Sequence, residues 1–227
     1  MLGHRGAPGY EPENSLASFR KALSLGADGV ELDVHTSASG HLIVHHDALI
    51  GGLGPIAELT LEQILMARLA HGEPIPTLPE ALGAVLERGD SPGARGSREV
   101  WIELKSLPDS ADGVLFAAID GSPAPEACAV HSFDHRIVAR IGAQRPSLRR
   151  GILSASYPID PVSPMRMAGA TTLWQEWHLV DSDLVAAIHG SGGEVIAWTV
   201  DDAETARWLR ELGVDGLCGN WPERLKW

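Results

Sequence analysis

Residues 29–34 read Gly-Val-Glu-Leu-Asp-Val, an alternation of apolar and acidic side chains that indicates the fold class of this chain. Successive residues of a β-strand point to opposite faces, so the three apolar side chains share one face and Glu31 and Asp33 share the other. Two neighbouring carboxylates that turn inward repel each other and lose hydration. The stretch therefore predicts a strand that packs its apolar face under helices and holds a cation on its acidic face.

A second stretch, residues 100–105, repeats this alternation as Val-Trp-Ile-Glu-Leu-Lys. Trp101, Glu103 and Lys105 share the face opposite the apolar residues, which adds a third inward carboxylate with a lysine beside it. Three carboxylates without a cysteine favour one hard divalent ion, Mg²⁺ or Ca²⁺. The alternative interpretation is the ordinary alternation of an edge strand, or salt bridges to Lys105.

Around these stretches, short apolar runs alternate with amphipathic runs of helical length, which is typical of repeated βα units and a parallel sheet. Strands are expected near residues 1–4, 28–34, 99–104, 127–131, 148–153, 171–174, 194–198 and 214–218, with a short extra strand over 41–45. Helices are expected over residues 15–25, 78–88, 110–118, 134–141, 181–189 and 202–212. Asn14 is the predicted N-cap of the first helix, and Asp201 and Asp202 form the acidic start of the last. Irregular stretches are expected over 89–98, 121–126 and 154–164.

Eight strands and 227 residues fit a single (β/α)₈ TIM barrel, which needs roughly 200 to 250 residues, as one α/β domain over 1–227. An open doubly wound sheet is the alternative. The first βα turn has neither a GxGxxG nor a GxxxxGK[ST] phosphate loop, which disfavours that alternative.

The charge balance restricts the partners of the chain. A net charge of −12 argues against a nucleic-acid partner and requires a cation or a local Arg/Lys group at any phosphate site. The two cysteines, Cys128 and Cys218, match no metal or redox spacing, which suits a reducing compartment. No apolar run approaches the ~18 residues of a membrane span, and no leader is visible, so a cytoplasmic location is expected.

Two histidines stand where strands are expected to end. His4 closes the first strand, and His46 follows an apolar run and precedes an aspartate. Cleavage of a phosphodiester takes a proton from the nucleophile and gives one to the leaving oxygen, and imidazole titrates in the range for both. His35, His41 and His45 are interpreted as bystanders.

These residues resemble the glycerophosphodiester phosphodiesterase family, and the likeness runs in order along nearly the whole chain. The matching motifs are His4-Arg5-Gly6, Pro12-Glu13-Asn14-Ser15, Glu31-x-Asp33, His46-Asp47, Glu103-x-Lys105, Ser132-Phe133 and Trp198-Thr199. Each motif is weak alone, whereas the ordered series is specific.

The resemblance implies a (β/α)₈ barrel that hydrolyses glycerophosphodiesters, such as glycerophosphocholine and glycerophosphoethanolamine, to sn-glycerol 3-phosphate and an alcohol. It further implies these roles: Glu31, Asp33 and Glu103 as ligands of one divalent metal ion, His4 and His46 as the acid–base pair, Arg5 and Lys105 as phosphate-binding residues, and Trp198 on the glycerol side.

The chain departs from the family pattern at three places. Ser39 stands at a turn position where relatives usually have aspartate, and Gly219-Asn220 replaces the usual Thr-Asp. The second change is expected to alter the barrel mouth or a contact that orients the site. The segment between His46 and Pro76 is short, which predicts a reduced insertion after the second strand and a more open site.

Other functions stay open at this point. A lysophospholipase D or a phosphatidylinositol-type phospholipase would use the same barrel with a broad apolar rim, and a non-catalytic phosphodiester-binding relative is a third possibility. The candidate rim residues are Leu49, Ile50, Leu53 and Trp177. The sequence leaves open whether the protein is a monomer or a homodimer.

Trp101 is expected to pack below the metal, and Glu176 is a further candidate for the site. The remaining tryptophans are interpreted as core or interface residues: Trp174, Trp177, Trp208, Trp221 and Trp227.

Overall fold

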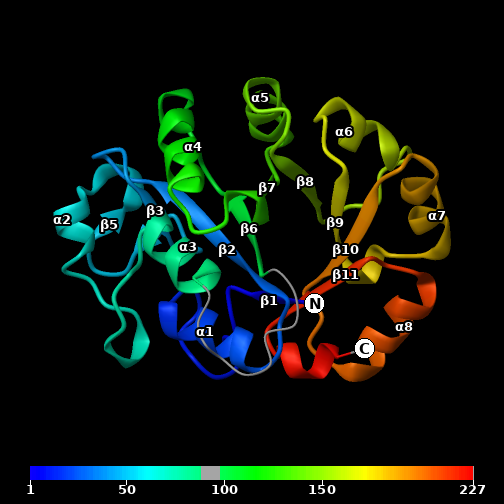
Figure 1. The fold of residues 1–227 in the computed structure, drawn as a ribbon, viewed down its shortest axis with the longest axis horizontal. Coiled ribbons are helices and arrows are strands. Elements are labelled where there is room, and N and C mark those ends of the chain that lie inside the picture. Colours follow the sequence, from blue (N-terminus) through cyan, green and yellow to red (C-terminus); the bar gives the residue numbers. More distant parts are fainter. Residues whose placement is uncertain (88–97, 227) are drawn as a thin grey trace.

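A computed structural model describes residues 1–87 and 98–226 and contains a closed β-barrel (Figure 1). Its eight parallel strands are β1 (Leu2–His4), β2 (Gly29–Thr36), β6 (Glu99–Leu104), β7 (Cys128–Ser132), β8 (Arg149–Ser154), β9 (Thr172–Glu176), β10 (Glu194–Trp198) and β11 (Gly216–Gly219). The barrel closes because Leu2 of β1 pairs with Gly29 of β2 on one side and with Cys218 of β11 on the other. The predicted (β/α)₈ fold is confirmed, and the open sheet is wrong.

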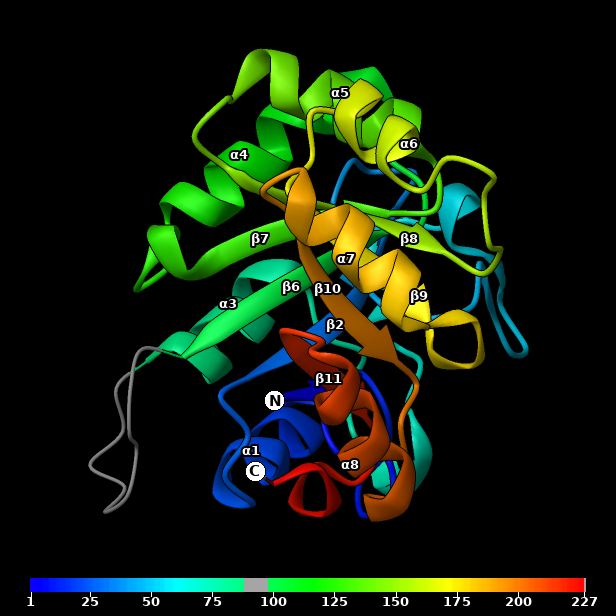
Figure 2. The same ribbon diagram turned by 90° about the vertical axis from the view of Figure 1, so that its right-hand side faces the viewer.

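Helices from the described residues cover the outside of the barrel (Figures 1 and 2). They are α1 (Leu16–Ser24), α3 (Leu78–Leu86), α4 (Asp112–Asp120), α5 (His135–Gln144), α6 (Val162–Met167), α7 (Ser182–Gly190) and α8 (Ala203–Leu212). The last helix begins at the N-cap Asp202, whose carboxylate accepts hydrogen bonds from two backbone N–H groups, and ends at Gly213 in the left-handed conformation. Within the described residues, no helix is long and apolar enough to cross a membrane.

The segment after β2 is small, as predicted from its length. It contains β3 (Leu42–Val44), which pairs antiparallel with β2, the hairpin of β4 (Leu49–Ile50) and β5 (Gly54–Pro55), and the short helix α2 (Leu61–Ile64). Its apolar residues form their own cluster around Ile43 and Ile56. The insertion after β2 is therefore a compact unit attached to β2 instead of a large inserted domain.

Two local predictions were wrong. The stretch 154–164 was expected to be irregular, but α6 begins at Val162, where Asp160 accepts hydrogen bonds from the N–H groups of Val162 and Ser163. The N-cap of α1 is Ser15, not Asn14, because the Ser15 hydroxyl accepts the N–H of Ser18. Most of the predicted irregular stretch 89–98 lies outside the described residues, which include only its last residue, Arg98. Arg88, the last residue of the predicted helix 78–88, and Trp227 lie outside them as well.

The barrel interior is filled below its mouth by a tight apolar cluster. Its members are Leu2, Trp101, Ala129, Leu153, Trp174, Ile196 and Cys218. Larger apolar clusters lie between the strands and the helices. Burying one large apolar side chain contributes about 1.5–3 kcal/mol. The inward side chains below the mouth are therefore apolar, whereas β2 and β6 contribute the buried acidic residues Glu31, Asp33 and Glu103.

Candidate active site

A cavity of about 200 Å³ opens at the C-terminal ends of the barrel strands. Its lining residues are His4, Arg5, Glu31, His46, Glu103, Lys105, His131, Phe133, Leu153, Trp174 and Trp198. All the residues to which the family resemblance gives a role are in this set except Asp33, which contacts Arg5 and Lys105. In TIM barrels this end of the strands is where substrates bind.

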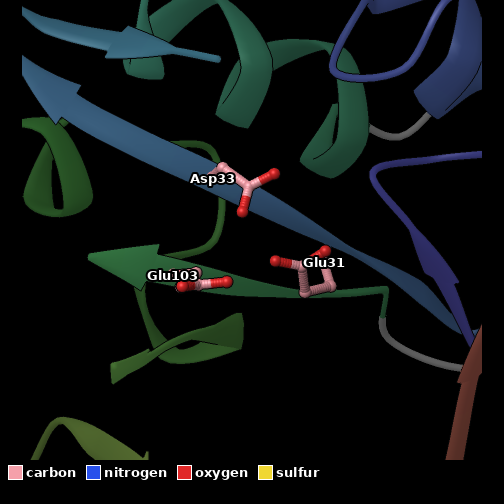
Figure 3. Close-up of side chains that lie close together, drawn as sticks. All are labelled: Glu31, Asp33 and Glu103. Atoms are coloured by element: carbon pink, nitrogen blue, oxygen red, sulfur yellow. The ribbon is translucent and has the colours of Figure 1, made fainter. Parts of the chain in front are cut away.

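The acidic residues of β2 and β6 meet at the mouth of this cavity (Figure 3). One carboxylate oxygen from each of Glu31, Asp33 and Glu103 lies within 4.8 Å of the others, and all three residues are buried. Asp33 and Glu103 are directly paired in the register of the two strands. Both strands have neighbours on each side, so the edge-strand interpretation is wrong.

The burial of these carboxylates changes their proton affinities. Burial and the charge of Asp33 raise the pKa of Glu31 to about 7. Burial and the charge of Glu31 raise the pKa of Glu103 to about 8. Burial also opposes ionisation of Asp33, but Lys105 and Arg5 outweigh it and lower the pKa of Asp33 to about 2. The cluster therefore holds protons near neutral pH that a metal ion would displace.

Two basic side chains neutralise part of the cluster. The Lys105 Nζ atom lies 3.1 Å from Asp33 Oδ1 and 2.8 Å from Glu103 Oε1, and the Arg5 Nε atom lies 3.2 Å from Asp33 Oδ2. The salt bridges considered from the sequence thus exist, but two cations face three buried carboxylates. An all-oxygen, buried and under-neutralised donor set fits one hard divalent ion such as Mg²⁺ or Ca²⁺.

The loops that carry Arg5 and Asn14 hold their backbones in an unusual conformation. Arg5 has φ 52° and Asn14 has φ 57°, in the left-handed region that costs a non-glycine residue roughly 1–2 kcal/mol. In this conformation the Arg5 N–H donates to Glu31 Oε2 at 3.1 Å, and Asn14 Nδ2 donates to Asp33 Oδ2 at 2.8 Å. Asn14, predicted as a helix cap, is instead a buried partner of the acidic cluster.

The two cavity histidines predicted from the sequence have different partners. His4 Nδ1 lies 2.9 Å from the amide oxygen of Asn220, and His46 Nδ1 lies 2.8 Å from Asp47 Oδ1. The hydrogen bond from His46 lowers the pKa of Asp47, so that this carboxylate stays ionised. His35 is buried, with its Nε2 atom 3.0 Å from the carbonyl of His46.

The remaining histidines considered from the sequence lie outside the cavity. His41 Nδ1 lies 3.0 Å from the Ser39 hydroxyl, and His45 Nδ1 lies 2.8 Å from the carbonyl of Asp47. Neither residue lines the cavity.

Sequence reasoning missed His131, at the end of β7. It is fully buried, lines the cavity, and pairs in register with Glu103. Its Nε2 atom lies 3.8 Å from Glu31 Oε1, and neither ring nitrogen has a hydrogen-bond partner among the described residues. Burial lowers the pKa of His131 to about 3, which keeps the ring neutral. A signal was available in the sequence. The two-residue period of the predicted strand 127–131 places its last residue, His131, on the same face as Ala129, just before the family motif Ser132-Phe133.

Of the tryptophans predicted to lie near the site, one lines the cavity and another packs in the barrel interior. Trp198 lines the cavity, with its ring centroid 5.6 Å from that of Phe133. Trp101 packs against Trp174 at 5.2 Å in the barrel interior, as expected for a residue below the mouth. Glu176, the further candidate, accepts a hydrogen bond from the backbone N–H of His178 and does not line the cavity.

The predicted apolar rim is only partly present. Leu49 and Leu53 are 60% and 43% exposed, while Ile50 is buried in the small cluster beside β3. Trp177 packs against His178 and Trp208 and does not line the cavity. A broad apolar surface for a lipid is not formed by these residues.

The barrel mouth combines three carboxylates that could bind a metal ion with two cationic side chains and several imidazoles. This combination suits the hydrolysis of a phosphate ester. Residues 4–224 match the Glycerophosphoryl diester phosphodiesterase family. The chain belongs to this family of phosphodiesterases.

Several similar proteins match almost the entire chain. The glycerophosphodiester phosphodiesterase of Caldanaerobacter subterraneus subsp. tengcongensis is 33% identical over 99% of this chain and 95% of its own length. That of Bacillus altitudinis is 27% identical over 99% and 95%. The Oleispira antarctica phosphodiesterase in complex with sn-glycerol-3-phosphate superposes with a TM-score of 0.87 at 24% identity, covering 99% of this chain and 94% of that one, which supports the fold.

Proposed function

We propose that this enzyme hydrolyses glycerophosphodiesters to sn-glycerol 3-phosphate and an alcohol in a metal-dependent reaction. The observation that carries the proposal is the buried cluster of Glu31, Asp33 and Glu103 at a small cavity that Arg5, Lys105, His4 and His46 also line. Membership of the family and the product bound by the Oleispira antarctica phosphodiesterase support the choice of substrate. The compact cavity favours a glycerol phosphate over a lipid.

Glu31, Asp33 and Glu103 would hold one Mg²⁺ or Ca²⁺ ion. When bound, such an ion polarises a phosphate oxygen and stabilises the negative charge that develops on the phosphoryl group. The same three carboxylates, once ionised, would each offer an oxygen, which is the donor that both ions prefer.

The residues of the chain would carry the proton transfers. His4 takes the proton of the glycerol 2-hydroxyl while that oxygen attacks phosphorus, and the bond from phosphorus to the departing alcohol oxygen breaks as His46 protonates it. The resulting cyclic phosphate is opened by water with the two roles reversed. Arg5 and Lys105 would bind the non-bridging oxygens, and Trp198 would line the glycerol side.

A second groove supports a site that is open toward the alcohol. It measures about 880 Å³ and shares Lys105 with the cavity. Its other polar lining residues include Ser37, Ser106, Ser110, Asp134, Arg136 and Arg140. A hydrophilic alcohol would suit the polar part of this lining.

The two free cysteines bear on the location of the enzyme. Cys128 and Cys218 are both buried and both free. Free thiols suit the reducing cytoplasm. We therefore include a cytoplasmic location in the proposal.

The test is release of sn-glycerol 3-phosphate from glycerophosphocholine and glycerophosphoethanolamine, first with EDTA and then with Mg²⁺ or Ca²⁺ added back. We expect no release in EDTA and recovery with one of the ions. Glu103→Gln should reduce kcat by more than the ~10- to 100-fold that outer-shell metal partners cost. Glu176→Gln, at a carboxylate outside the cavity, is the matched control. Full activity in EDTA would refute the metal-dependent reaction.

A further inference from the structure

A chain of hydrogen bonds leads from the last βα loops to His4. The side chain of Asp201, which follows β10, accepts the backbone N–H of Asn220 at Oδ1 and the amide Nδ2 of Asn220 at Oδ2, both at 2.8 Å. The Asn220 Oδ1 atom then lies 2.9 Å from His4 Nδ1. Closure of the barrel between β1 and β11 brings His4 and Asn220 together from opposite ends of the sequence.

These hydrogen bonds permit only one placement of the protons on Asn220 and His4. The Asp201 carboxylate can only accept hydrogen bonds, so the Asn220 amide must turn its NH₂ group toward it. Its carbonyl oxygen therefore faces His4, and a carbonyl can only accept. His4 Nδ1 must carry the hydrogen. In the neutral ring Nε2 then keeps a free electron pair.

We propose that Asn220 is a positioning residue for His4, and that Asp201 orients Asn220. The pair holds the neutral ring of His4 in the Nδ1–H tautomer, which leaves Nε2 as the nitrogen able to take a proton from a substrate hydroxyl. This inference rests on the proposed function, in which His4 acts as the base. It gives Asp201 a role separate from that of Asp202, which alone caps α8.

The nature of the partner separates the two histidines. Asn220 is a neutral amide that accepts the hydrogen bond from Nδ1–H but does not take up the proton. It therefore fixes the orientation and tautomer of His4 without adding a charge. His46 instead donates to the ionised carboxylate of Asp47. A neutral, pre-oriented ring suits the group that starts the reaction as a base, and a ring beside a carboxylate suits the group that starts as an acid.

The inference predicts a loss in kcat rather than in substrate binding. A general base typically contributes ~10²–10⁴-fold to the rate, and a ring in the wrong tautomer loses that contribution. Asn220→Leu keeps the number and branching of the side-chain heavy atoms and has no hydrogen-bonding group. It should lower kcat by ~10²-fold or more with KM little changed, because the lost contribution acts in the transition state.

Exchanging the carboxylate and the amide between positions 201 and 220 tests the order of these hydrogen bonds. Asn220→Asp alone would set two carboxylates at the position of a 2.8 Å hydrogen bond, and their repulsion should disorder His4 and reduce kcat. Adding Asp201→Asn restores a donor between the two side chains and leaves an acceptor toward His4. The double variant should therefore recover activity relative to Asn220→Asp. Asp202→Asn, a neighbouring change that keeps a good N-cap, is the control.

The tautomer itself is measured by ¹⁵N NMR on the metal-free enzyme without substrate, at a pH where the imidazoles are neutral. The signals of His4 are assigned by their loss in His4→Gln. We expect the Nδ1–H form in the wild type and in the double variant, and a shift toward the Nε2–H form in Asn220→Leu, with melting temperatures confirming that each variant is folded.

Two results would overturn the inference. One is an Nε2–H tautomer of His4 in the wild type, and the other is an Asn220→Leu enzyme that is folded and has wild-type kcat. Failure of the proposed function is distinguishable, because it would abolish turnover in the wild type while the NMR measurement still reports the tautomer.

Discussion

Metal binding should be coupled to proton release, because the ligands proposed for the ion are protonated near neutral pH in its absence. Glu31 and Glu103 have pKa values of about 7 and about 8, whereas Asp33 is ionised throughout this range. An ion can bind fully only to ionised carboxylates. Each ion that binds at low pH must therefore displace the protons of Glu31 and Glu103.

The size of the effect follows from these pKa values. At pH 6 both side chains are almost fully protonated, so one bound ion should release about two protons, and at pH 9 almost none. Below pH 6 the apparent Kd should fall by about 100-fold for each unit of rising pH, and it should level off above pH 8.

The assay is isothermal titration calorimetry with Mg²⁺ or Ca²⁺ in pairs of buffers that differ in ionisation enthalpy, since the difference in heat counts the protons released. Glu103→Gln should reduce the count at pH 6 to about one proton, because only Glu31 still gives one up. A Kd that is independent of pH between 5.5 and 8 in the wild type would refute the coupling.

Three further outcomes are expected. His4→Ala and His46→Ala should each lower kcat by ~10²–10⁴-fold while the melting temperature changes little, because each removes a proton-transfer group at the cavity surface. His131→Leu should weaken metal binding by ~10- to 100-fold, as measured by calorimetry, because its unpartnered ring nitrogen faces Glu31 and outer-shell groups orient ligands. In EDTA, the contribution of Glu31 and Glu103 to the free energy of unfolding should fall as pH rises from about 5 to 8, because raised pKa values mean that the folded state holds protons which the unfolded state has lost.

Each of these outcomes has a control. His41→Ala changes a histidine outside the cavity and should keep full activity. His131→Gln keeps an N–H donor and should retain more metal affinity than His131→Leu. For the pH dependence, Glu31→Gln with Glu103→Gln should abolish the decline measured by thermal melting in EDTA. A decline that persists in this double variant would assign it to other groups.

Much of the fold was predictable because its main signals are local. The alternation of residues 29–34 and 100–105 needs only the two-residue period of a strand to place Glu31, Asp33 and Glu103 on inward faces. The strand 99–104 was predicted with the bounds it has in the structure. The family motifs extended this information to the fold and the reaction class. The roles of the individual site residues stay predictions.

What only the tertiary structure decided depends on contacts between distant parts of the chain. Barrel closure sets Asn220 beside His4, and the register of β6 with β7 sets His131 beside the carboxylates. The raised pKa values of the acidic residues likewise result from burial, which no local pattern measures. A period of two tells which face a side chain occupies, but not which residue from another strand it meets. The sequence by itself therefore determined the strands and their inward faces, and the tertiary structure determined the partner of His4 and the burial of the carboxylates.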